Sequence, residues 1–219
     1  STKSVWFQGR FGFIASYAYN HIEKKQEWLA ASKSCIDFIE THCTDIDGHL
    51  FFEVTEEGIP LRKRRYVFSE CFAAIAMSEY AIASGDKNYA TKALEMFKRI
   101  LKFLSTPGFL EPKYLPTLQS RGHSITMILI NTASRIREVI EDPVLDRQIN
   151  ESLTSIRQYF MHPEFKALLE MVGPKGELID TCNGRTINPG HCIETSWFIM
   201  EEARHRNWDK DLVQLALQI

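Results

Sequence analysis

The sequence lacks the usual markers of several protein classes. Its five cysteines are an odd number and show neither Cys-x-x-Cys nor zinc-finger Cys/His spacing, which excludes a disulfide framework and a structural zinc module. Reduced thiols are therefore expected, as is typical of a cytoplasmic protein. No apolar run approaches the roughly 18 residues of a membrane-spanning helix, so no membrane partner is expected.

The chain also lacks an excess of charge of either sign. Its 26 lysines and arginines and 28 aspartates and glutamates give a formal net charge of −2. Because nucleic-acid-binding domains carry a basic patch, no nucleic-acid partner is expected. The one basic cluster, residues 62–65 (RKRR), is predicted to be a solvated loop edge. No glycine-rich phosphate loop is present, so no nucleotide site is assigned.

What remains is an ordinary globular composition, 44% hydrophobic over 219 residues, which suffices for a core without metals or disulfides. Residues 68–84 are apolar nearly all round, which predicts a helix buried on most sides. Residues 87–104 are amphipathic and are predicted to lie outside it. Helical periodicity predicts eight helices in all, over 4–20, 24–43, 68–84, 87–104, 119–140, 144–160, 190–206 and 208–219.

The helices are predicted to form pairs, each with a short link. Ser84-Gly85-Asp86 is such a link, since glycine suits the left-handed conformation that ends a helix. The loop 44–67 between two pairs contains HLFFEVTEEGIPL, whose alternation predicts a short β-hairpin. Repeated hairpins with such apolar inner helices favour a closed all-α ring over an open solenoid. Loops on one side of a ring would form a ligand cleft.

The segment NPGHCIETSWF has the clearest chemical content. Asn188 is predicted to cap a helix that has Pro189 at its first position. His191 then lies in the first turn, where the helix dipole disfavours imidazolium, and a neutral histidine can act as a general base. Glu194 and Trp197 extend the same face, and a base, an acid and an aromatic platform suit a sugar.

Other interpretations of this segment remain open. A hydrogen-bonded structural role for His191 is an equal alternative. A metal site through His191 and Glu194 is weaker, because neither H-E-x-x-H nor H-x-x-E-H is complete, and no metal is predicted.

Two shorter segments add candidate residues. In SVWFQGR, the residues Gln8 and Arg10 stand among aromatic residues, which is typical of a binding rim. Arg10 is a candidate for holding a sugar oxygen, with a structural ion pair as the alternative. In RGH, His123 opens a predicted helix, where a capping role is at least as compatible as a role in binding.

These segments together resemble the N-acylglucosamine 2-epimerase family. NPGHCIETSWF resembles the family's PGHxxExxWF motif, WFQGR its WxQGR motif, and YVFSECF with SEY its next inner helix. The resemblance covers essentially the whole chain in the same order and spacing. It implies an (α/α)6 toroid of helical hairpins that interconverts N-acetylglucosamine and N-acetylmannosamine at C2.

The resemblance also implies roles for single residues. It makes His191 a catalytic histidine, Arg10 an essential arginine and Glu194 a site carboxylate, with Trp197 and His123 flanking the sugar cleft. It further implies a homodimer, chemistry that requires no cofactor, and in several members ATP as an allosteric activator.

Two features of the chain depart from the family pattern. Asn188 replaces a frequent histidine, which is harmless at a cap. A second catalytic histidine is expected beyond residue 219, because His205 lies on the helix of His191, about 21 Å further along at 1.5 Å per residue.

Four helix pairs, where the family ring needs six, predict that residues 1–219 are one barrel domain truncated at both ends. The apolar stripe in the final LVQLALQI agrees with this. The isolated polypeptide is therefore expected to be poorly soluble and inactive.

Three other function classes compete with this one. The nearest is a cellobiose 2-epimerase or an aldose–ketose isomerase on the same barrel. A glycosidase or lyase would need paired carboxylates, for which Glu70 and Glu194 are the candidates. A non-catalytic carbohydrate-binding toroid would hold the sugar without exchanging its C2 hydrogen.

Overall fold

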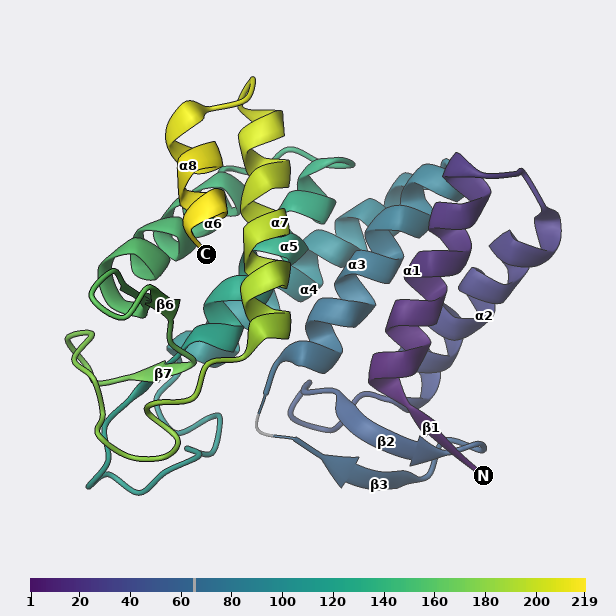
Figure 1. The fold of residues 1–219 in the computed structure, drawn as a ribbon. Coiled ribbons are helices and arrows are strands. Elements are labelled where there is room, and N and C mark those ends of the chain that lie inside the picture. Colours follow the sequence, from purple (N-terminus) through teal and green to yellow (C-terminus); the bar gives the residue numbers. More distant parts are fainter. Residues whose placement is uncertain (65) are drawn as a thin grey trace. The chain divides into compact units, whose positions relative to one another are not determined.

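The computed structural model describes residues 1–64 and 66–219 (Figure 1). The chain divides into two compact units. The first comprises Ser1–Lys113 with Arg135–Asp142, and the second Tyr114–Ser134 with Pro143–Ile219. All eight predicted helices are present in the described chain, each within a few residues of its expected bounds.

Two helical hairpins form the first unit. α1 (Val5–His21) packs against both α2 (Gln26–His42) and α3 (Phe68–Ser84), and α3 packs against α4 (Lys87–Ser105), as Figure 1 shows. Every residue of α3 from 69 to 81 is buried, which confirms the prediction for this helix. The predicted link also holds, because Gly85 adopts a left-handed φ of 73° and Asp86 caps α4 through the Asn88 N–H.

A glycine sets the distance between α1 and α3. A Cβ atom added at Gly9 would lie 2.7 Å from the Cβ of Phe72, well inside van der Waals contact. Only glycine therefore allows the two backbones to approach this closely. The contact also brings the neighbouring side chains of Trp6 and Arg10 onto the ring of Phe72.

A three-stranded antiparallel sheet completes the first unit, with the order β1 (Thr2–Ser4), β2 (Phe51–Thr55) and β3 (Pro60–Lys63). β2 and β3 are the predicted hairpin, and β1 is a strand that was not predicted. Of the basic cluster, Arg62 and Lys63 are exposed on β3, which agrees with a solvated edge, whereas Arg65 lies outside the described residues.

The second unit holds the other four helices. They are α5 (His123–Arg137), whose last three residues belong to the first unit, α6 (Pro143–Ser155), and α7 (Pro189–His205), which packs against α8 (Lys210–Gln218). α6 continues into a π-helical turn, η1 (Ile156–Phe160). In the described part of the chain, no helix combines the length and apolar character needed to cross a lipid bilayer.

Two very short strand pairs lie between these helices. β4 (Arg121–Gly122) pairs with β7 (Met171–Val172), and β5 (Met161–His162) pairs with β6 (Ala167–Leu168), both antiparallel. Because β4 takes residues 121 and 122, α5 begins at residue 123 rather than at the predicted 119.

Candidate active site

The first turn of α7 holds His191 by its backbone on both sides. The Asn188 side chain accepts a hydrogen bond from the His191 N–H at 3.3 Å, and Pro189 occupies the first helical position, as predicted. The Thr195 hydroxyl donates to the His191 carbonyl oxygen at 2.7 Å. The start of α7 therefore fixes the position from which the imidazole projects.

The β4–β7 pair brings two further residues together. Gly122 lies opposite Met171, and the ladder continues as the His123 N–H donates to the Glu170 carbonyl oxygen at 3.0 Å. The Glu170 N–H donates to the carbonyl oxygen of Thr186, in the loop that leads into α7, at 3.3 Å. Backbone hydrogen bonds thus tie Glu170 to the starts of both α5 and α7.

Three side chains from these segments form a cluster, which we call the histidine–glutamate cluster: His123, Glu170 and His191. Glu170 Oε1 lies 2.8 Å from His191 Nδ1 and 3.8 Å from His123 Nδ1. His123 Nε2 lies 3.1 Å from the Thr195 hydroxyl oxygen. The side chain of His123 is fully buried, whereas one third of that of His191 is exposed. His191 is thus the histidine of the cluster that a ligand can reach.

The cluster favours an ionised carboxylate at its centre. Burial acts to raise the pKa of Glu170, but the proximity of His123 and His191 outweighs it and holds that pKa below its usual range. Glu170 therefore acts as a negatively charged hydrogen-bond acceptor at neutral pH.

The other two predicted site residues of α7 are exposed. Glu194 is exposed, and the Trp197 side chain is 44% exposed with its ring centroid 5.1 Å from that of Phe198. Both are open to a ligand, but neither supplies the carboxylate of the histidine–glutamate cluster. That carboxylate comes from Glu170.

Gln8 and Arg10 belong to α1 and thus to the first unit. The Arg10 guanidinium carbon lies 4.1 Å from the ring centroid of Phe72 and 5.8 Å from that of Trp6. Arg10 is exposed, and its described partners are these aromatic rings rather than a carboxylate. A stacked guanidinium keeps its N–H groups available to an oxygen of a ligand.

Comparison with known proteins places this chain in a family. The sequence model of the N-acylglucosamine 2-epimerase (GlcNAc 2-epimerase) family matches residues 1–219. The chain belongs to this family.

Curated relatives named N-acylglucosamine 2-epimerase include those from Bos taurus and Rattus norvegicus. Each is 28% identical, over 211 and 209 residues, which is 93% and 92% of this chain and 50% of either relative. The chain therefore spans about half the length of these relatives. A cellobiose 2-epimerase from Ruminococcus albus is 31% identical over 101 residues, which is 46% of this chain and 26% of the relative.

Solved structures support the fold prediction. The cellobiose 2-epimerase from Bacillus thermoamylovorans has a TM-score of 0.86 at 18% identity. The superposition covers all of this chain and 60% of that enzyme's chain. A sugar epimerase from a ruminal bacterium has a TM-score of 0.81 at 20% identity and covers all of this chain and 59% of its own. The predicted class of helical-hairpin toroid is confirmed by this likeness, which at such identities concerns the fold alone.

Glu170 and Thr195 are two residues of the site that were not predicted from the sequence. Glu170 is the single acid in an otherwise apolar run, ALLEMV (residues 167–172), and an acid there is a signal that a partner is needed. Thr195 stands next to Glu194 in the predicted motif, but it is buried, on the side of α7 that contacts His123.

The histidine–glutamate cluster is also the one group among residues 1–64 and 66–219 whose ligand atoms are arranged so that they could hold a metal ion, all within 4.8 Å of one another. It differs from the pair considered from the sequence, since the carboxylate is Glu170 and not Glu194. A direct hydrogen bond of 2.8 Å between Glu170 and His191 accounts for their contact without an ion.

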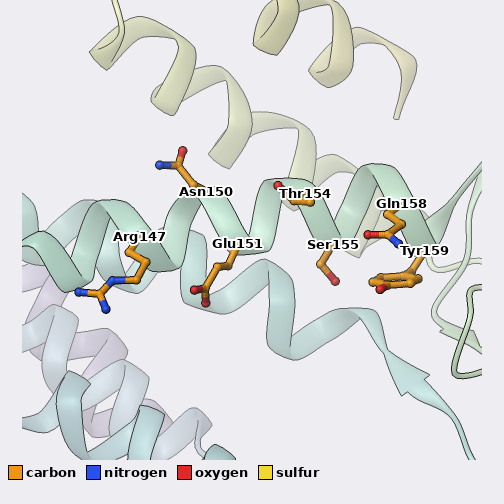
Figure 2. Close-up of a pocket in the computed structure, with 7 residues that line it drawn as sticks. All are labelled: Arg147, Asn150, Glu151, Thr154, Ser155, Gln158 and Tyr159. Carbon is orange, nitrogen blue, oxygen red and sulfur yellow. The ribbon is translucent and has the colours of Figure 1, made fainter.

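A hollow of about 610 Å³ lies elsewhere in the second unit, along α6 and η1 (Figure 2). Its lining residues are mostly exposed, include one arginine and one glutamate, and contain no predicted site residue. The lining residues are Arg147, Asn150, Glu151, Thr154, Ser155, Gln158 and Tyr159. The histidine–glutamate cluster, with a partly exposed histidine on a buried support, is the stronger candidate active site.

Proposed function

We propose that the protein containing this chain is a sugar 2-epimerase that interconverts N-acetylglucosamine and N-acetylmannosamine. The observation that carries this assignment is the partly exposed His191, with Glu170 behind it at 2.8 Å, in a chain that matches the N-acylglucosamine 2-epimerase family from end to end. A base supported in this way is what proton abstraction from carbon requires.

The reaction follows from the chemistry of the sugar. In the open-chain form the C2 hydrogen lies next to the C1 aldehyde, so its removal gives an enediolate. Protonation of that planar intermediate from the opposite face inverts C2. His191 serves one face, and a second proton-transfer group must serve the other. Proton transfer alone accomplishes this reaction, so no redox or metal cofactor is required for it.

The remaining candidates take supporting roles. Arg10 stabilises the negative charge that develops on the C1 oxygen, because its guanidinium is stacked but open. Gln8, Glu194 and Trp197 contact the sugar. His123 is fully buried, so we assign it to the support of Glu170 rather than to contact with the substrate. ATP activation and the homodimer remain predictions from the family resemblance, and a cytoplasmic location remains a prediction from the cysteine pattern.

A second candidate is a cellobiose 2-epimerase, favoured by the 31% identity over 101 residues and by the similarity of fold. The same base would act on a disaccharide, so the chemistry does not separate the two. Parallel assays with N-acetylmannosamine, cellobiose and free mannose would do so, and conversion of cellobiose alone would contradict the N-acyl sugar assignment.

The direct test follows the C2 hydrogen. The full-length enzyme is incubated with N-acetylmannosamine in heavy water, and proton NMR monitors C2. We expect the C2 proton signal to disappear while N-acetylglucosamine deuterated at C2 accumulates. Binding of the sugar with no exchange at C2 would instead indicate a carbohydrate-binding protein.

A further inference from the structure

We propose that Glu170 is a positioning residue that holds His191 in the tautomer protonated on Nδ1, so that Nε2 is the atom that exchanges a proton with C2. This role rests on the epimerase activity proposed above. It assigns to the reaction a residue, Glu170, that none of the sequence motifs contains.

A direct hydrogen bond joins Glu170 to His191. Glu170 Oε1 and His191 Nδ1 are 2.8 Å apart, a distance that requires a proton between them. An ionised carboxylate only accepts hydrogen bonds, so the proton is on Nδ1. A neutral imidazole carries one ring proton, and the lone pair that can act as a base is then on Nε2.

Glu170 is held firmly in position. Its backbone N–H and carbonyl oxygen are both bonded, to Thr186 and His123 respectively. Its side chain is only 19% exposed. A carboxylate that is fixed by its own backbone and largely withdrawn from water can orient a partner ring, whereas a mobile surface carboxylate cannot.

The hydroxyl proton of Thr195 determines which ring nitrogen of His123 is protonated. Its hydroxyl has one hydrogen, which it donates to the His191 carbonyl oxygen, so at its contact with His123 it must accept from Nε2–H. His123 Nδ1 lies 3.8 Å from the Glu170 carboxylate, beyond hydrogen-bond distance, and has no hydrogen-bond partner among the described residues. Thr195 thus connects the backbone of His191, the proposed base, to the side chain of His123.

The chemical consequence appears when the C2 proton moves. As His191 Nε2 takes the proton, the ring becomes an imidazolium. The negative charge of the Glu170 carboxylate next to Nδ1 stabilises this imidazolium in the transition state. In Glu170→Gln that charge is lost, and the amide can donate to Nδ1 and select the opposite tautomer. Loss of a carboxylate in such a position lowers kcat by on the order of a hundredfold or more.

The test measures both turnover and tautomer in the full-length enzyme. For Glu170→Gln we expect kcat to fall about a hundredfold with a change in KM within about threefold. Glu170→Asp, which keeps the charge, should recover part of the loss. Nitrogen-15 spectra of histidine-labelled protein should show a protonated Nδ1 and an unprotonated Nε2 for His191, assigned by the signals missing in His191→Gln. Glu170→Gln should shift this pattern towards a protonated Nε2.

Glu164→Gln is a matched control. Glu164 Oε1 lies 2.9 Å from the Nδ1 of His162 in the same unit, but it is 57% exposed and outside the histidine–glutamate cluster. We expect its turnover and the His191 spectrum to match the parent. A comparable loss in this variant would show that a general effect of charge removal, and not the support of His191, explains the result at Glu170.

The outcomes separate this inference from the proposed function. Absence of C2 exchange in the parent enzyme, or full activity of His191→Gln, contradicts the proposed function. An active parent with an inactive His191→Gln but a fully active Glu170→Gln contradicts the role of Glu170 alone. A parent spectrum with His191 protonated on Nε2 also overturns it, even if Glu170→Gln does not fold. So does a stoichiometric metal ion on Nδ1, because it would displace the proton.

Discussion

Each compact unit contains a histidine that is hydrogen-bonded to a largely buried glutamate, and these two pairs, His49–Glu70 and His191–Glu170, differ in the second ring nitrogen of the histidine. In the first unit, His49 Nδ1 lies 2.5 Å from Glu70 Oε1 and Nε2 lies 2.8 Å from the Arg64 carbonyl oxygen. In the second, His191 uses Nδ1 for Glu170 and is one third exposed. The same pair is therefore sealed in one place and left open in the other, and only the open one can exchange a proton with a substrate.

The sealed pair has a different electrostatic state. Both nitrogens of His49 face acceptors, so both carry protons, and Glu70 also accepts from the Leu50 N–H at 2.6 Å. Burial acts to lower the pKa of His49, but the hydrogen bond and charge of Glu70 and the Arg64 carbonyl outweigh it, and that pKa is raised. These contacts favour the imidazolium form of His49, which joins the start of the hairpin to α3.

The largest expected effect follows from the open pair. His191→Gln should lower epimerisation by about a hundred- to ten-thousand-fold, because a proton-transfer group is lost, while the circular dichroism spectrum and the melting temperature stay close to the parent. The control is His205→Gln, an exposed histidine at the other end of α7, which should keep its turnover. Near-normal turnover of His191→Gln would mean that this histidine is structural.

The sealed pair should respond in the opposite way. His49→Ala leaves the Glu70 carboxylate buried without its cation, which is expected to cost about 3–5 kcal/mol in free energy of unfolding. Urea denaturation of the full-length enzyme measures this, and turnover well below the transition should change little. In a double-mutant cycle, His49→Leu with Glu70→Leu should cost less than the two single changes added together. Additive costs would show that the pair is not coupled.

Most of the helical fold could be predicted, because its signals are local. Apolar periodicity defines the eight helices, and the Gly85 turn and the Asn188 cap depend on residues within a few positions of each other. The strands β1, β4 and β7 could not be predicted. Each has only two or three residues and exists because a distant segment pairs with it, as Arg121 does with Val172.

The candidate site likewise has one residue that could be predicted from local sequence and one that could not. His191 could be placed at the start of a helix because Asn188 and Pro189 precede it. Its partner could not be identified, because Glu170 is 21 residues earlier in an irregular segment and reaches His191 through the β4–β7 pair. The carboxylate that could be predicted, Glu194, lies three residues after His191 on the same helix and is exposed. Spacing identifies residues on one helix, whereas this pair joins two segments.

A moderate effect is expected at Arg10, which tests whether the first unit contributes to catalysis as well as to stability. Arg10→Lys should lower kcat/KM by on the order of a hundredfold, because lysine cannot present a planar two-pronged donor to the C1 oxygen. Arg62→Lys is the matched control, since Arg62 is another exposed arginine of this unit over a ring, 5.4 Å from the centroid of Phe52. Equal activity of Arg10→Lys and the parent would remove Arg10 from the site.

The smallest expected effect is the pH dependence of stability caused by His49. Its pKa is raised in the folded state, so folding takes up a proton there as pH rises above the unfolded value of about 6.5. The stabilisation is complete below that value and is lost as pH increases through the folded pKa. The difference in free energy of unfolding between the parent and His49→Gln should therefore be largest near pH 6 and shrink towards alkaline pH.

Taking this difference at each pH cancels groups common to both proteins, including Lys63, whose positive charge acts on His49 in the opposite sense to Glu70. The change is small because a single proton is involved. Denaturant titrations at intervals between pH 6 and 9 would measure it. A difference that stays constant over this range would mean that His49 is not the buried cation, and the two pairs would then differ in exposure but not in charge.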